Sequence, residues 1–243
     1  MPFRIHQRGA VTSTNDDIKA LANEGAPAFT VVSATEQTEG RGRRGRSWKS
    51  PPGNLYVSLL VRPPRPASEA SQLSLVAAVA LGDALAEYVP SSRIHNKWPN
   101  DVHVDGRKIA GLLLESSGGG QGNVEWVVIG CGVNIAVHPN LEEYDTISLD
   151  SVTDEKSSID EFLTFFLKHF EARYDIWINR GIDPIRKAWI KRADNIGREI
   201  VVRLPQADIK GVFEGLNASG ALILTRADGR RELVTAGEVF AEY

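Results

Sequence analysis

Cysteine is nearly absent from this sequence, and several motifs that would assign a function at once are missing. Cys131 is the only cysteine among 243 residues, so no internal disulfide can form. The five histidines make no H-x-x-x-H or Cys/His pattern, which argues against a zinc site held by the protein. The sequence shows neither a basic-then-apolar signal peptide nor an apolar run of membrane length. We therefore expect a cytoplasmic protein that does not bind a membrane. Any metal ion that it needs is expected to arrive with a substrate.

The chain also lacks a strong excess of charge of either sign. Its formal net charge is −3, which argues against general nucleic-acid binding. Four arginines nevertheless lie together in GRGRRGR, residues 40–46, on a frame of three glycines. Glycine leaves backbone N–H groups open to a ligand, and the planar arginine side chain matches phosphate or carboxylate oxygens. The segment predicts a loop that binds a compact anion, with a solvated basic turn as the alternative.

The glycines of this loop fit G-x-G-x-x-G, the fingerprint of dinucleotide sites, but their context does not. That fingerprint requires a helix directly behind it. Here SWKSPPGNLYVSLLV follows, in which Pro51 and Pro52 block a helix and residues 55–61 are typical of a strand. The chain also lacks G-x-x-x-x-G-K-[ST], so we expect any ATP to bind outside a P-loop.

Hydrophobic periodicity divides the chain into a larger mixed part and a small β module. The predicted helices cover residues 13–25, 68–89, 157–177 and 183–193, and the predicted strands cover 29–37, 55–61, 93–116 as a hairpin, and 124–135. After about Asn195, short strands alternate with NASG and ADG turns. We therefore predict an α+β fold, with a mixed β-sheet domain and packed helices over residues 1–194 and a small β-barrel over residues 195–243.

A second group of polar residues lies in KWPND, residues 97–101, and in RKIAG, residues 107–111. Asp105-Gly106 between them is a tight hairpin signal. The turn is expected to bring four side chains together at strand ends: Lys97, Asn100, Asp101 and Lys108. Lysine at such a place acts as a point charge on phosphate, and an aspartate can orient an amine or a metal-bound nucleotide. The alternative is that all four are exposed strand-end groups.

A third motif is GCGVNI, residues 130–135, at the end of an apolar strand. Glycines inside a strand allow a ligand or another backbone to come close, so Gly130 and Gly132 indicate a close approach. Asn134 then presents an amide at the strand end. No acidifying partner of Cys131 is evident, so we interpret this cysteine as a small buried hydrophobic residue without a nucleophilic role.

Taken together, four segments resemble the biotin–protein ligases, also called holocarboxylase synthetases. They are TSTND at 12–16, EQTEGRGRRGRSW at 36–48, KWPND with RKIAGLLLE at 97–115, and VIGCGVNI at 128–135. Their order and spacing span about half the chain, and the predicted β module lies where that family has an SH3-like C-terminal domain. The resemblance implies a monofunctional ligase that forms biotinyl-AMP from biotin and ATP with Mg²⁺ and then passes the biotinyl group to a lysine of a carrier domain.

The resemblance also assigns residues to three tasks. Those expected to bind biotin are Ser13, Thr14, Asn15, Gln37, Arg41, Gly42, Arg43, Lys108, Gly111 and Gly132. Those expected to bind ATP or its metal are Arg41, Arg43, Arg46, Lys97, Asn100, Lys108 and Asn134. The expected catalytic residues are Lys108, Arg43 and Asp101, the last of which would orient the incoming lysine. The arginine loop would close over the reactive adenylate and shield it from water.

The partners implied by the resemblance are proteins that carry biotin. The expected acceptor is the biotin carboxyl carrier protein of acetyl-CoA carboxylase or of a related carboxylase, and the family suggests a homodimer. Only eleven residues precede TSTND, too few for the helix-turn-helix of the family's repressors, so we expect no operator DNA binding. Two alternatives stay open: a lipoate–protein ligase, which also adenylates a small acid, and an adaptor module that binds anions without catalysis.

Overall fold

The larger part of the chain is organised around a seven-stranded sheet with strand order β1-β2-β3-β7-β6-β5-β4. The structure is a computed structural model, and it describes residues 2–118, 122–142, 144–204, 207–235 and 237–241. The strands of this sheet are β1 (Arg4–Val11), β2 (Thr30–Gln37), β3 (Leu55–Val61), β4 (Ile94–Lys97), β5 (Asp101–Val104), β6 (Arg107–Gly118) and β7 (Val124–Val133). All neighbouring strands are antiparallel except β1 and β2, which are parallel.

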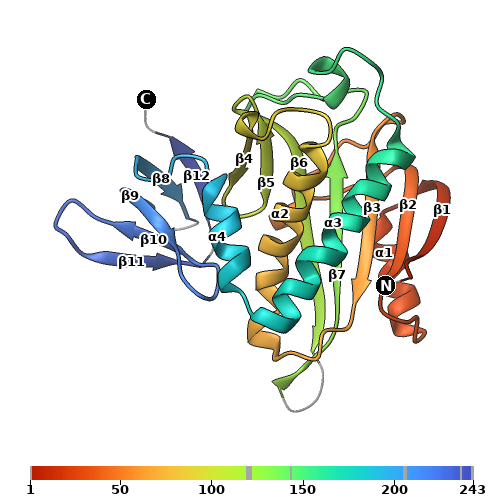
Figure 1. Cartoon of the computed structure of the whole chain (residues 1–243), viewed down its shortest axis with the longest axis horizontal. Helices are drawn as coiled ribbons and strands as arrows, with labels where there is room; N and C mark the ends of the chain where they lie inside the picture. The colour runs from red at the N-terminus through yellow and green to blue at the C-terminus, as the bar shows by residue number, and fades with distance from the viewer. Residues whose placement is uncertain (1, 119–121, 143, 205–206, 236, 242–243) are drawn as a thin grey trace.

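Helices cover the two faces of this sheet unequally (Figure 1). The helices are α1 (Thr14–Asn23), α2 (Leu73–Leu85), α3 (Ile159–Arg180) and α4 (Asp183–Lys191), with short 3-10 turns at Arg43–Gly45, Ala67–Gln72, Ser91–Arg93 and Leu149–Ser151. Helix α2 is buried on nearly all sides because it lies between the sheet and α3. Helix α1 packs on the opposite face, where Ile18 and Ala22 meet Val32, Leu60 and Val128. None of the helices in the described residues is long and apolar enough to cross a membrane.

The turn between β5 and β6 has the conformation that the sequence predicted. Asp105 has φ 52° and Gly106 has φ 74°, the two consecutive positive values of a tight hairpin turn. The turn sets β5 against β6, so that Asp101 pairs with Gly111 and His103 with Lys108. It thereby carries KWPND and RKIAG to the same end of the sheet.

The C-terminal module is a separate five-stranded antiparallel sheet of order β11-β10-β9-β8-β12. Its strands are β8 (Glu199–Arg203), β9 (Asp208–Leu216), β10 (Leu222–Thr225), β11 (Arg231–Val234) and β12 (Glu238–Ala241). The module contacts the larger domain through side chains of both parts. Trp98 Nε1 donates to the Gly220 carbonyl oxygen at 3.0 Å, and Arg186 Nη1 donates to the Leu216 carbonyl oxygen at 2.9 Å.

The predicted α+β architecture is confirmed, but strands β1 and β12 were not predicted, and the first arm of the predicted hairpin is divided into β4 and β5. The strand at residues 55–61, the central hairpin and the long helices all occur where the periodicity indicated. The sequence reading assigned no element to the residues of β1, which forms an exposed edge of the sheet. Six of its eight residues are exposed, so it shows none of the apolar alternation by which a half-buried strand is recognised.

Candidate functional site

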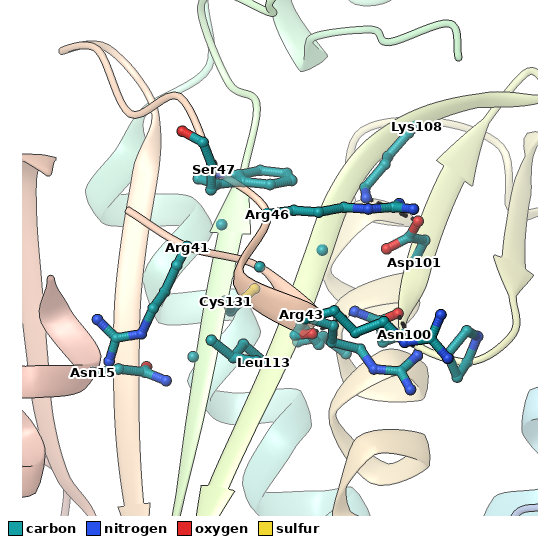
Figure 2. Close-up of a pocket in the computed structure, with 18 of the residues that line it drawn as sticks. Asn15, Arg41, Arg43, Arg46, Ser47, Asn100, Asp101, Lys108, Leu113 and Cys131 are labelled. Atoms are coloured by element: carbon teal, nitrogen blue, oxygen red, sulfur yellow. Dashed lines mark hydrogen bonds and ion pairs between the residues drawn. The ribbon is translucent and has the colours of Figure 1, made fainter. Parts of the chain in front are cut away.

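The predicted site residues converge on one pocket, on the sheet face opposite α2 and α3 (Figure 2). Its walls come from the arginine loop (residues 40–48), the first turn of α1, the connection between β4 and β5, and strands β6 and β7. The predicted residues that line it are Ser13, Thr14, Asn15, Gln37, Arg41, Gly42, Arg43, Arg46, Lys97, Asn100, Asp101, Lys108, Gly111 and Gly132. Segments that are far apart in the sequence therefore form a single cavity.

One end of the pocket, here called the polar end, consists of Ser13, Thr14, Asn15 and Gln37. Thr14 donates from its backbone N and its Oγ1 to Gln37 Oε1 at 2.9 and 3.1 Å. The buried Ser58 Oγ donates to Asn15 Oδ1 at 2.6 Å. A Cβ added at Gly130 would collide with the Asn15 amide, so this strand position requires glycine. Uncharged donors and acceptors held this rigidly suit a neutral polar ligand.

Charged residues form a cluster directly beside the polar end. Arg41 donates from both terminal nitrogens to the two carboxylate oxygens of Asp16, each at 2.6 Å. Glu115 accepts from Asn15 Nδ2 at 2.7 Å and from Lys19 Nζ at 2.8 Å, and it lies 3.4 Å from Arg41. The Arg41 hydrogen bonds hold the pKa of Asp16 at about 2, well below its ordinary value. Arg41 therefore points toward Asn15 and away from Lys108 (Figure 2).

The arginine loop is closed by its own backbone hydrogen bonds. Trp48 N donates to the Gly40 carbonyl oxygen at 2.8 Å, and Gly42 N donates to the Arg46 carbonyl oxygen at 2.7 Å. A Cβ at Gly40 would lie 2.5 Å from the Trp48 carbonyl oxygen, which excludes larger residues there. Arg44 has φ 57°, a strained value for a residue with a side chain. The loop thus places Arg43 and Arg46 over the pocket.

Trp48, at the end of this loop, lies on a floor made of two glycines. A Cβ at Gly132 would lie 2.5 Å from Trp48 Nε1, and one at Gly111 would lie 3.2 Å from its ring. Lys108 Nζ is 5.3 Å from the Trp48 ring centroid and 5.0 Å from that of Tyr144. Trp48 Nε1 is buried and has no hydrogen-bond partner among the described residues. The indole N–H thus packs against the glycine floor at Gly132.

The other end of the pocket, here called the cationic end, contains Lys108, Arg43, Arg46 and Lys97. Lys108 Nζ lies 2.8 Å from Asp101 Oδ2, with only 12% of the lysine side chain exposed. Arg43 Nη1 donates to Asn100 Oδ1 at 3.5 Å. Lys97 Nζ lies 5.6 Å from the ring centroid of Phe240 in the C-terminal module. Several cations around one small cavity suit a phosphate or a carboxylate.

Asn134 does not join this pocket. Its side chain is buried, and its Nδ2 donates to the Ile147 carbonyl oxygen at 3.1 Å. Its backbone N and O bond Ile109 and Leu149. These bonds give the amide a structural role between β7 and the segment at residues 147–149, and its predicted nucleotide contact stays a prediction.

The residues at or beneath the pocket that were not assigned to it from the sequence include Ser58, Glu115, Tyr144 and Gly237. Ser58 and Glu115 act through Asn15, from which they are separated by 43 and 100 residues. A polar residue inside the apolar run LYVSLLV was the available signal for Ser58. Nothing local to the sequence indicated that Gly237, in the C-terminal module, would reach this cavity.

Comparison with known proteins places both parts of the chain in one family. Residues 9–134 match the Biotin/lipoate A/B protein ligase family, and residues 196–241 match the Biotin protein ligase C terminal domain. A biotin–[acetyl-CoA-carboxylase] ligase of Paracoccus denitrificans is 43% identical over 235 residues, covering 94% of this chain and 96% of that protein. The bifunctional ligase/repressor BirA of Bacillus subtilis is 34% identical over 232 residues, covering 93% of this chain and 70% of that protein.

Solved structures of ligases with bound ligands have the same fold. The biotin protein ligase of Aquifex aeolicus in complex with biotin and ATP matches with a TM-score of 0.83 and 26% identity, covering 98% of each chain. The biotin protein ligase of Leishmania major in complex with biotinyl-5-AMP matches with a TM-score of 0.69 and 28% identity, covering 97% of this chain and all of that one. The chain belongs to the biotin protein ligases, and the alternative of a lipoate ligase is not favoured.

Proposed function

We propose that the two ends of the pocket divide the work of a biotin protein ligase, which activates biotin with ATP and attaches it to a protein. The polar end would bind the ureido ring of biotin, because its fixed amide and hydroxyl groups match a neutral ring with N–H donors and a carbonyl acceptor. The cationic end would hold the biotin carboxylate and the phosphates of ATP. The observation that carries this assignment is that both ends belong to a single pocket.

In the first step, a carboxylate oxygen of biotin attacks the α-phosphorus of ATP. A new oxygen–phosphorus bond forms, the bond from the α-phosphorus to the bridging oxygen breaks, and pyrophosphate leaves. Negative charge builds on the α-phosphate, so the fixed cations Lys108 and Arg43 would stabilise the transition state. Asp101, with Oδ2 2.8 Å from Lys108 Nζ, would hold the lysine in position.

Mg²⁺ is expected to enter this pocket with ATP. The described residues contain no group of three or more His, Cys, Asp or Glu side chains that could hold a metal ion. The acceptor oxygens near the phosphates are those of Asn100 and Asp101, which suit a hard cation already bound to ATP. Mg²⁺ would supply charge neutralisation of the phosphates, and Arg46 and Lys97 would contact the same groups.

In the second step, the amine of an acceptor lysine attacks the acyl carbon of biotinyl-AMP. The bond from that carbon to the phosphate oxygen breaks, AMP leaves, and the proton of the amine passes to solvent. Asp101 is our candidate for orienting the amine, because its second oxygen faces Gly111 at the pocket floor, 3.6 Å from the position of a Cβ there. Closure of the arginine loop would keep water from the mixed anhydride before the acceptor arrives.

The acceptor proposed here is the biotin carrier domain of a carboxylase. The name of the Paracoccus denitrificans relative, a biotin–[acetyl-CoA-carboxylase] ligase, supports the acetyl-CoA carboxylase carrier as the first one to test. A homodimer and the lack of operator binding stay predictions.

ATP–pyrophosphate exchange with purified protein and Mg²⁺ tests the first step. The assay compares biotin, lipoate and no added acid. We expect exchange with biotin alone, because the polar end matches the ureido ring, which lipoate lacks. Exchange supported only by lipoate would overturn the assignment of the polar end. Lack of exchange with either acid would leave an anion-binding module without catalysis.

A further inference from the structure

The charged cluster beside the polar end joins three segments that are separate in the sequence. Asp16 and Lys19 come from α1, Arg41 from the arginine loop, and Glu115 from β6. Lys19 Nζ lies 2.9 Å from Asp16 and 2.8 Å from Glu115, so the two carboxylates and the two cations all interact. The cluster is electrically balanced only while the loop is docked on α1 with Arg41 in place.

Removal of Arg41 from this cluster would leave two carboxylates facing one ammonium group. Such an imbalance is unfavourable in a partly buried place, and the side chains of Arg41 and Glu115 are only 30% and 28% exposed. The pair with Asp16 is also bidentate, with both distances 2.6 Å, a geometry that lysine could not reproduce. The contact is therefore more selective than an ordinary surface ion pair.

The same cluster fixes a residue of the polar end. Glu115 accepts from Asn15 Nδ2 and Ser58 donates to Asn15 Oδ1, so the amide has a single orientation. Asp16 directly follows Asn15 at the start of α1. Arg41 is also the loop residue that forms a β-bridge with Ser47, and the bonds that close the loop lie next to it. The position of the loop and the orientation of Asn15 are thus set by one group of charges.

We propose that Asp16 and Glu115 are positioning residues, which hold Arg41 so that the arginine loop stays docked on α1 and biotinyl-AMP is retained. Arg41 then serves as the anchor of the loop, while Arg43 and Lys108 are the cations that face the anion. Neither carboxylate touches the reacting atoms. The retention of biotinyl-AMP rests on the proposed function, whereas the docking of the loop does not.

Asp16→Asn tests the anchor, and Asp17→Asn is its matched control. Both variants remove one carboxylate from the first turn of α1. Asp17 lies outside the charged cluster, and its Oδ2 is 4.0 Å from Arg8 Nε. The first measurement is hydrogen exchange of the unliganded protein. In Asp16→Asn we expect faster exchange of the backbone amides of Gly42, Arg46 and Trp48, which donate the hydrogen bonds within the loop. Peptides from α2 and α3 should exchange as in the unmodified protein.

The second measurement is the release rate of labelled biotinyl-AMP, preformed on the enzyme and chased with unlabelled biotin and ATP. We expect roughly threefold to tenfold faster release in Asp16→Asn, a moderate factor because the Asp16 side chain is 42% exposed and solvent screens the pair. The KM for biotin should rise more than kcat falls. Glu115→Gln, which keeps an acceptor for Asn15, should show a smaller change, since Arg41 lies 3.4 Å from Glu115.

Arg41→Gln completes a double-mutant cycle with Asp16→Asn. If the two residues act through one contact, the double variant releases biotinyl-AMP no faster than the faster single variant. Additive effects, or loop exchange in Asp16→Asn equal to that in Asp17→Asn, would overturn the proposal. The exchange experiment uses no biotin or ATP, so it judges the anchor even if the ATP–pyrophosphate assay fails.

Discussion

Gly132→Ala is the change whose consequence the structure defines most sharply. Gly132 lies on β7 beneath Trp48, and an added Cβ would lie 2.5, 2.7 and 2.9 Å from three atoms of the indole. Ordinary carbon contacts begin at about 3.5 Å, so the indole or the strand must move by roughly 1 Å. The strand is hydrogen-bonded on both sides, to β3 and β6, whereas Trp48 belongs to a loop. We expect the loop to move.

The size of the effect follows from where the strain is relieved. Overpacking costs about 1–3 kcal/mol. If opening of the loop relieves this strain, the equilibrium between the closed and the open loop shifts roughly fivefold to hundredfold toward the open form. The fold itself should change little. Alanine in place of a glycine of compatible backbone stabilises by about 0.4–1 kcal/mol, since the unfolded chain loses freedom. Activity should therefore fall while the free energy of unfolding stays nearly constant.

The assay is biotin-dependent ATP–pyrophosphate exchange, measured with urea unfolding on the same preparations. Gly9→Ala is the control, because an added Cβ at Gly9 of β1 meets nothing within 4 Å. We expect a higher KM for biotin in Gly132→Ala and unchanged values in Gly9→Ala. Unchanged exchange together with an unchanged free energy of unfolding in Gly132→Ala would refute the packing of Trp48 on this glycine. A large loss of stability with normal exchange would show that the strand had moved in place of the loop.

Three further predictions concern single side chains. Lys108→Ala should lower biotin-dependent exchange by about a hundredfold or more while the protein still melts cooperatively, and unchanged exchange would remove Lys108 from the catalytic set. Burial lowers the pKa of His103 to about 4, so the unfolded chain binds its proton first as the pH falls below about 6.5. His103 should therefore lower the free energy of unfolding by about 2 kcal/mol between pH 7 and pH 5. In His103→Gln, the urea midpoint should fall less over the same pH range than it does in the unmodified protein. Burial also raises the pKa of the Cys131 thiol to about 12, so iodoacetamide at pH 8 should label Cys131 only after unfolding, and labelling of the native protein would contradict its buried position.

Much of the fold could be predicted because its signals are local. The Asp105-Gly106 turn and the apolar run at residues 55–61 each specify an element within a few residues. Strand β1 carries no such signal. It pairs in parallel with β2 across the intervening helix α1, so no tight turn marks it, and its side chains are mostly exposed. Strand β1 is placed by its backbone pairing with β2, and no pattern of apolar side chains marks it in the sequence.

The candidate site divides in the same way. Residue chemistry alone predicted an anion-binding arginine loop, and the resemblance to the biotin–protein ligases supplied the residues of the polar end. The direction in which the Arg41 side chain points could not be predicted, since it depends on Asp16 and Glu115, which are 25 and 74 residues away. Ser58 and Glu115 are ordinary residues of their strands until the fold brings them to Asn15.

The C-terminal module contributes to the lining of this pocket. Gly237 lines the cavity, and the centroid of the Phe240 ring is 5.6 Å from Lys97 Nζ and 3.9 Å from the Arg203 guanidinium carbon. An aromatic ring attracts a cation at such distances. Lys97 therefore contacts the module, and a nucleotide bound at the cationic end would meet a residue that lies beside Phe240. The predicted boundary between residues 194 and 195 separates two folding patterns in the sequence, but the cationic end of the pocket is built from both sides of it.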